Sequence, residues 1–181
     1  SKITETVVEK KDGTTEKVTD IVKADGTTIH EDISTTAKGK KTATVIEVSP
    51  TGDRTVTESV TKPNGNYEKT TSETVVKKDA EGNIIGETTV IRIEEKSGKT
   101  IQAATFKMSD SAKKTITLTS ATTTAKNGVV IIPKSVKSDG KTYKVTKLVK
   151  GMLKGSETKP KKVDLQAGSI KTVQSGAFNN L

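Results

Sequence analysis

Five glycines follow one another at a constant interval of 13 residues in the first part of the chain: Gly13, Gly26, Gly39, Gly52 and Gly65. Each lies in a turn-like sequence, namely KDGT, ADGT, KGKK, PTGD and PNGN. Asp-Gly and Asn-Gly are strong hairpin signals, because these residues accept the positive φ that tight turns require. The segments between the glycines are Thr-rich and long enough for a strand of about nine residues. The interval therefore predicts an antiparallel meander with one strand per 13 residues.

Two later turns are expected at Gly82 and Gly98, where the interval lengthens to 17 and 16 residues. The sequence DAEGN at Asp79–Asn83 is faintly similar to a calcium-binding loop. Such a loop needs a bidentate Glu at its twelfth position, which here is Val90. We therefore interpret DAEGN as a turn.

The composition favours a sheet that buries little. Only 30% of the 181 residues are hydrophobic and 2% are aromatic, whereas ordinary globular domains are roughly 45–50% apolar when glycine is included. Threonine is stiff at χ1 and suits a strand whose two faces both meet water. Disordered chains instead favour Pro, Ser, Gln and Glu over β-branched residues. We expect a mainly β chain whose residues 1–103 form an elongated, Thr-rich antiparallel meander.

Two-residue loops of type I′ at the first two Asp-Gly pairs predict a register in which Ile3 faces Val22 and Val22 faces Ile29. The same loops at Gly39 and Gly52 add Val48 and Thr55 to this row. A second row on the same face has three members: Val7, Val18 and Ile33. The opposite face is then mostly Thr, Lys and Glu, the one-sided pattern of an antiparallel sheet.

This register also stacks Glu5, Asp20 and Glu31 as neighbours, and like charges directly opposite are unfavourable. Such a row could hold a cation. The alternative is a three-residue bulged loop at some turns, which would flip the later strands to the other face.

The charge and the cysteine content exclude several classes. The net charge is +9 and the pI is near 9.5, but lysines are spread along the chain among Glu and Asp, and stacking aromatics are scarce, which disfavours nucleic-acid binding. A soluble surface with edge lysines is favoured, and attraction to anionic cell-surface polymers is compatible with it.

The absence of Cys excludes disulfides, thiolate zinc sites and Cys nucleophiles. We find no signal peptide, transmembrane-length apolar span or lipidation motif, and the strand-like start predicts a segment upstream.

From about Ala104 the 13-residue interval stops. A hairpin is predicted with strands near Ala104–Met108 and Thr115–Leu118. Apolar density then rises in two repeat units, each a short strand followed by a second apolar group that could form a helical turn. The first repeat unit has Val130, Ile132 and Val136, then Tyr143, Val145, Leu148, Met152 and Leu153; the second repeat unit has Val163, Leu165 and Ile170, then Val173, Ala177 and Phe178. Neither repeat unit can bury its apolar side alone, so we expect the repeat units to stack.

Two sequences carry a family resemblance: VVIIPKSVKSDGKTYKVTKL and IKTVQSGAFNNL. They are similar to V-x-I-P-x-x-V followed by G-K-x-Y-K-V-T, and to I-x-x-I-x-x-x-A-F-x-x-C/L. The chain from about Ala104 to Leu181 thereby resembles the BspA-like leucine-rich repeat family of bacterial surface proteins. It departs from the pattern at Met152-Leu153, where the family has Ala-Phe, and in VDLQAGSI, which lacks the Pro of VIIPKSV. We interpret these as the cap and first repeats.

The resemblance implies a curved solenoid with parallel strands on its concave side, exposed outside the cell, with roles in adhesion or in host or matrix contact. It transfers no functional residues, because the motifs are structural. If the resemblance holds, the core positions of the second repeat unit are Val163, Leu165, Ile170, Val173, Ala177 and Phe178. About two units lie in the chain, fewer than the three usually needed, so we expect it to be a piece of a longer protein.

The search for chemistry yields no catalytic, cofactor-binding or metal-ligating residue. His30 is the single His; the side chains of Glu31 and Asp32 alternate faces beside it, so we predict an exposed strand residue. Neither a phosphate-binding G-x-x-x-x-G-K-[ST] nor a dinucleotide-binding G-x-G-x-x-G motif occurs. Paired carboxylates of the glycosidase kind meet only in the folded chain.

The hypothesis is a non-enzymatic bacterial cell-surface or secreted protein. Residues 1–103 would be a spacer and residues 104–181 a leucine-rich-repeat module that binds a host or matrix protein or a cell-surface glycan. Two alternatives stay open. One is an accessory region of a secreted polysaccharide-acting enzyme, and the other is a structural module with no ligand. The oligomeric state is left open.

Overall fold

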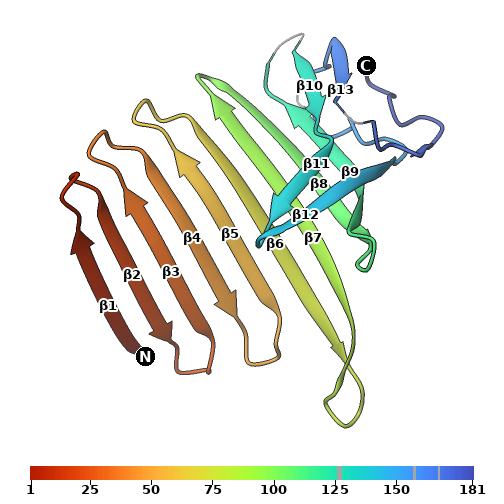
Figure 1. Cartoon of the computed structure of the whole chain (residues 1–181). Helices are drawn as coiled ribbons and strands as arrows, with labels where there is room; N and C mark the ends of the chain where they lie inside the picture. Colours follow the sequence, from red (N-terminus) through yellow and green to blue (C-terminus); the bar gives the residue numbers. More distant parts are fainter. Residues whose placement is uncertain (126–127, 157, 167) are drawn as a thin grey trace. The chain divides into compact units, whose positions relative to one another are not determined.

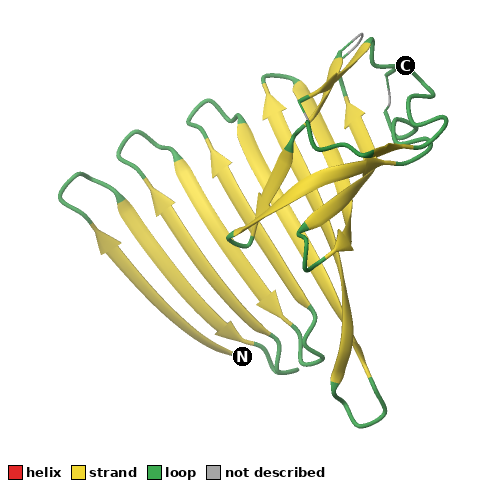
Figure 2. Ribbon diagram, turned by 45° about the vertical axis from the view of Figure 1, so that its right-hand side comes forward, coloured by secondary structure: helices red, strands yellow, loops and turns green. Residues whose placement is uncertain are grey.

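The computed structural model describes residues 1–181 except 126–127, 157 and 167. The described residues form strands and loops and no helix, as Figure 2 shows. The chain divides into two compact units, Ser1–Thr89 and Val90–Leu181. The division at residues 103 and 104 rests on the change in sequence pattern and stays a prediction.

The first unit is the expected antiparallel meander. Figure 1 shows β1 to β6 side by side, with successive strands running in opposite directions. Each strand is hydrogen-bonded to the next in chain order. The strands are β1 (Lys2–Glu9), β2 (Thr15–Val22), β3 (Thr28–Thr35), β4 (Lys41–Val48), β5 (Arg54–Thr61), β6 (Tyr67–Lys78) and β7 (Ile84–Ser97), the last of which continues into the second unit.

The turns of the meander are three-residue loops. At the first, the Lys10 N–H donates to the Thr14 carbonyl at 2.8 Å, and the Gly13 N–H donates to the Lys10 carbonyl at 2.9 Å. Gly13 has a φ of 77°, the left-handed conformation that closes a bulged loop. The same hydrogen bonds recur at the turns of Gly26, Gly39, Gly52, Gly65 and Gly82. The predicted two-residue loops are therefore wrong in this unit, and the bulged alternative is correct.

The loop type changes the register by one residue. Ile3 faces Ile21, which faces Ile29, whereas Val22 faces Lys2 and Thr28. Across β1 to β6, all even-numbered residues share one face and all odd-numbered residues share the other. The predicted rows are wrong, because a one-residue slip moves a whole strand's side chains to the opposite face. Apolar side chains consequently lie on both faces.

The predicted stack of Glu5, Asp20 and Glu31 is also wrong. Glu5 and Glu31 both face Thr19, and Asp20 faces His30 on the other side of the sheet. The observed register therefore separates the carboxylates by a neutral side chain. The Lys17 Nζ neutralises Glu5 at 2.7 Å.

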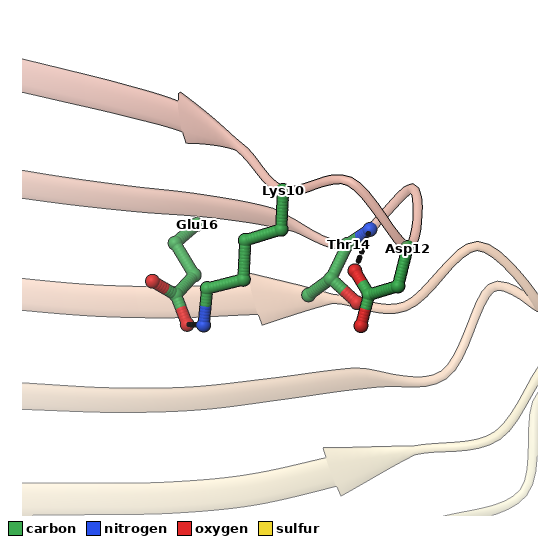
Figure 3. A network of polar contacts seen from close by, with 4 residues as sticks. All are labelled: Lys10, Asp12, Thr14 and Glu16. Carbon is green, nitrogen blue, oxygen red and sulfur yellow. Dashed lines mark hydrogen bonds and ion pairs between the residues drawn. The ribbon is translucent and has the colours of Figure 1, made fainter.

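A side-chain oxygen completes each turn. Because the Lys10 carbonyl accepts from Gly13, the Thr14 N–H is left without a ladder partner, and the Asp12 carboxylate accepts it at 2.9 Å. Figure 3 shows this contact beside the ion pair of Lys10 with Glu16. Asp25 and Asn64 accept in the same way from the residues after Gly26 and Gly65.

The other three turns have no Asp or Asn before the glycine, and their acceptor lies at the first turn position instead. These acceptors are Thr36, Ser49 and Asp79, which receive the N–H groups of Lys40, Asp53 and Asn83 at 3.1, 3.1 and 2.7 Å. All six turns thus satisfy the same amide from one of two positions. The repeated Asp-Gly-Thr-Thr sequence is one of these two solutions.

These contacts predict a loss of stability in acid. Hydrogen bonds from the Thr14 and Thr27 amides and hydroxyls lower the pKa of Asp12 and Asp25 from the usual 3.8. A carboxyl whose folded pKa is lowered stabilises the fold above its unfolded pKa, and this contribution disappears as the pH falls through the folded value. We expect the double variant Asp12→Asn/Asp25→Asn to show a smaller drop in melting temperature between pH 6 and pH 3 than the parent chain.

Asn keeps the acceptor oxygen, as Asn64 shows in the fifth turn, but its side chain does not titrate. Asp32→Asn, in the middle of β3, is the matched control. An acid response that the double variant and the control change equally would argue against the turn contacts.

The first unit, all of whose residues are described, buries little. Its one buried apolar side chain is Val56, 3% exposed, whereas Ile3 on the edge strand β1 is 63% exposed. Thr19 and Ser72 are the buried residues within β2 and β6. The threonine content therefore has its expected consequence, a sheet without a core of its own.

The second unit combines antiparallel and parallel pairing. The predicted hairpin is present as β8 and β9, which extend beyond the predicted strands, and β9, β12 and β14 then pair in parallel. A separate parallel pair joins β10 and β13. The strands are β8 (Thr100–Asp110), β9 (Thr115–Thr123), β10 (Val129–Ile132), β11 (Ser135–Ser138), β12 (Lys141–Leu148), β13 (Lys162–Leu165) and β14 (Thr172–Val173).

Two segments of this unit hold equivalent positions. Leu148 faces Val173, and three residues later the Gly151 N–H donates to the Gly176 carbonyl at 2.9 Å. Both glycines have a positive φ, 71° and 76°. The residues that follow them, Met152 and Ala177, are both buried. The predicted helical turns are instead runs of hydrogen-bonded turns.

The hydrophobic core lies in the second unit. Phe106, Ile116 and Leu118 are fully buried in it, with Val145 and Leu148 of β12. Of the predicted core positions in the second repeat unit, Ala177 is buried, and Val163, Ile170 and Phe178 pack against the core. Leu165 and Val173 are instead 42% and 47% exposed. The prediction is wrong for these two because β13 and β14 are each paired on one side only within the described chain.

Candidate functional site

The charge of the chain is concentrated in the second unit. Val90–Leu181 holds 18 Lys and Arg against 6 Asp and Glu, a balance of +12, and Ser1–Thr89 holds 13 against 16, a balance of −3. The whole-chain value of +9 conceals this difference. A count by segment would have revealed it from the sequence.

A shallow groove of about 440 Å³ lies on the second unit, over β8, β9, β12 and the start of β14. Three lysines line it: Lys107, Lys147 and Lys171. The rest of the lining is formed by five hydroxyl residues and two apolar residues: Ser109, Thr117, Thr119, Thr146 and Thr172, with Met108 and Val149. No carboxylate is among the lining residues that the structure describes.

One cross-strand row forms the middle of the groove. Lys107 of β8 faces Thr117 of β9, which faces Lys147 of β12, which faces Thr172 of β14. Residues directly opposite in a ladder point to the same face, so lysine and threonine alternate along the row. Lys107 and Lys147 are two strand spacings apart, about 10 Å.

Three irregularities in the strand pairing lie along the groove. Each irregularity in the pairing of β8 with β9 leaves one residue out of register, Ser109 on β8 and Thr119 on β9. The irregularity between β9 and β12 does the same to Thr146. All three residues line the groove. Ser109 and Thr119 follow Lys107 and Thr117 by two residues, so ordinary alternation already places them on this face. The bulge on β12 adds Thr146 to the same face beside its neighbour Lys147.

The polar groups in the groove are partly engaged with one another. The hydroxyls of Ser109 and Thr117 are 2.6 Å apart, and the Thr119 hydroxyl donates to the Thr105 carbonyl at 2.9 Å. Within the part of the chain that the structure describes, none of the three lysines pairs with a carboxylate. Three cations and a set of hydroxyls are therefore presented to solvent together, a chemistry that suits an anionic, hydroxyl-rich ligand.

His30 is exposed on β3, as predicted from the sequence. Its Nδ1 lies 2.7 Å from the Asp20 carboxylate, a cross-strand contact that the sequence pattern did not predict. The residue facing it on β4 is Ile46. A His–Asp pair acts in catalysis by activating a nucleophile on the free side of the ring, and the position opposite His30 on β4 carries no nucleophile.

The DAEGN sequence forms the expected turn. The Asp79 carboxylate accepts the N–H groups of Glu81 and Asn83 and the Asn83 side-chain amide. These oxygens serve the turn itself. No cluster of three or more His, Asp or Glu suited to a metal ion occurs among the described residues. The described part of the chain has no helix with the length and apolarity to cross a membrane.

Comparison of the chain with protein-family models, with curated proteins and with solved structures gave no match.

Proposed function

We propose that the chain belongs to a non-enzymatic bacterial cell-surface or secreted protein, in which the meander is a spacer and the second unit binds a ligand for adhesion or for host or matrix contact. The observation that carries the proposal is the separation of properties between the units. The first has a repeated strand and turn, no core and a balance of −3. The second has the core, the groove and a balance of +12.

The spacer role is supported by how the first unit is built. Its strands β1 to β5 have eight residues each, and its turns repeat one hydrogen-bond pattern. Each strand interacts mainly with its neighbours, so more strands add length without a larger core. Such a sheet offers few enclosed surfaces for a small ligand.

The leucine-rich-repeat assignment of the second unit belongs to the same proposal. It is supported by the parallel pairing of β9, β12 and β14 in chain order, since successive repeats of a solenoid stack in this way. It is further supported by the equivalence of Met152-Leu153 with Ala177-Phe178. The sequence resemblance aligns these two pairs, and the left-handed glycines Gly151 and Gly176 precede them.

The proposal predicts where a ligand binds. The full chain is tested on an array of host and matrix proteins and of glycans, and hydrogen exchange is then measured with and without the ligand found. We expect saturable binding and slower exchange confined to residues 90–181, with β1 to β6 unchanged. Protection within β1 to β6 would contradict the spacer role. No binding to any component would favour the structural module without a ligand.

A further inference from the structure

We propose that the groove of the second unit binds an acidic polysaccharide, a sugar chain that carries carboxylate or sulfate groups, laid along the row Lys107–Thr117–Lys147–Thr172. This inference rests on the proposed function, in that it assumes the second unit is the binding part. It adds the site, the chemical class of the ligand and the residues that contact it.

Hydroxyl residues gather with the lysines on one face of the groove. Regular alternation brings Ser109 and Thr119 to the face of Lys107 and Thr117. The bulge between β9 and β12 adds Thr146 to this face beside Lys147. Bulges are features that re-aim side chains beside binding sites. The hydroxyl groups of these three residues are donors and acceptors for the hydroxyls of a sugar chain.

The charge of the groove favours an anionic ligand. Lys107, Lys147 and Lys171 meet no carboxylate in the described chain, and the unit around them has a balance of +12. A lysine ammonium is a point charge with rotatable donors and does not demand the bidentate geometry of arginine. Lysines about 10 Å apart on alternate strands match anionic groups that recur once per disaccharide along a chain.

The composition of the groove disfavours nucleic acid as the ligand. Single strands are held by aromatic side chains on which bases stack, and the groove lining includes no aromatic residue. Phe106 is fully buried and Tyr143 is 7% exposed, both in the core. Arg92, the one arginine of the second unit, is not among the lining residues. The ligand must therefore be held by charge and hydroxyl contacts, as an acidic sugar chain can be.

The size of the groove suits a chain of sugars. A groove of about 440 Å³ that is open along four strands is larger than an inorganic anion needs. The side chains of Met108 and Val149 and the methylene stems of the lysines give it apolar strips, against which the C–H faces of sugar rings can pack.

The test compares two triple variants of the full chain with equal loss of charge. The groove variant is Lys107→Gln/Lys147→Gln/Lys171→Gln. The control is Lys137→Gln/Lys161→Gln/Lys162→Gln, at exposed lysines outside the groove. Affinity is measured for heparin as a sulfated chain, polygalacturonate as a carboxylated chain, neutral dextran and an oligothymidylate. We expect one or both acidic polysaccharides to bind, weakening with salt, and the groove variant to bind roughly 10–100-fold less tightly.

The affinity of the control variant is expected to fall by less than about threefold, because removing distant lysines only weakens the overall positive potential of the unit. Thr146→Val keeps shape and charge and removes one bulge hydroxyl. It should weaken binding severalfold without altering the salt dependence, which separates the hydroxyl contact from the field of the whole unit.

Three results would overturn the proposal: equal losses in both triple variants, tighter binding of the oligothymidylate than of either acidic polysaccharide, or no binding of an acidic polysaccharide at low salt. A neutral ligand that protects residues 90–181 from exchange would leave the proposed function intact and reject this inference. Binding that protects β1 to β6 would reject the proposed function itself.

Discussion

Replacement of Phe106 by Ala should lower the free energy of unfolding of the second unit by about 3–5 kcal/mol, the usual loss for a fully buried aromatic side chain. Phe106 lies on β8 with no exposed surface and faces Leu118, which is also fully buried. The core that they share is confined to this unit. Since whole domains are stable by only about 5–15 kcal/mol, the variant should lose a large fraction of the stability of this unit.

The measurement is urea denaturation followed by far-ultraviolet circular dichroism, together with amide exchange in β8, β9 and β12. Phe106→Leu keeps most of the apolar volume and should recover much of the loss. The control is Ile84→Ala on β7, where the side chain is 60% exposed and the expected loss is below about 1 kcal/mol. Similar losses for Phe106→Ala and Ile84→Ala would show that the core is not where the structure has it.

Substitution of the turn glycines should separate two effects that act at the same site. Gly65 has a φ of 81° and no atom within 4 Å of an added Cβ. At Gly13, by contrast, the added Cβ would lie 3.0 Å from the Cβ of Ala37, in the turn between β3 and β4. The left-handed conformation alone costs a side chain about 1–2 kcal/mol. Gly65→Ala should lose this amount, and Gly13→Ala should lose more because the Ala37 turn must also shift.

Val at the same positions should be worse than Ala, since a β-branched residue resists positive φ more strongly. Asn tolerates the left-handed region and should recover part of the loss at Gly65. Gly86→Ala is the matched control, because this glycine lies within β7 at ordinary φ with open space around it; there Ala should be neutral or stabilising. Equal melting temperatures for the Gly65 and Gly86 variants would contradict the left-handed turn.

Much of the first unit follows from its glycine positions, but the loop type was predicted wrongly. Asp-Gly fits a two-residue loop and a three-residue loop equally well. The distinguishing signal was in the fourth turn, PTGD. A two-residue loop would place the β-branched Thr51 at positive φ, which it resists, whereas the observed three-residue loop begins at Pro50, whose fixed φ suits the first loop position. The one additional residue in each loop changed the register, the face on which each side chain lies, and the neighbours of Glu5, Asp20 and Glu31.

The groove was missed for a different reason. Lys107, Lys147 and Lys171 are far apart in the sequence and come together through the antiparallel pairing of β8 with β9 and the parallel pairing of β9, β12 and β14. The bulge that adds Thr146 leaves no local mark in the sequence. Of the chemistry at the site, only the excess of lysine after Val90 was visible in advance. By contrast, the exposed position of His30 and the turn at Asp79–Asn83 followed from strand alternation and turn composition alone.

The sequence by itself determined where the turns of the meander lie, that its strands are antiparallel, and that the first unit would bury little. These are local properties, set by the φ of single residues and by the short supply of apolar side chains. The tertiary structure decided which side chains share a face, which strands pair in parallel and where the lysines meet. Those outcomes depend on hydrogen bonds between strands distant in the chain, and a one-residue shift in such pairing moves every side chain to the opposite face.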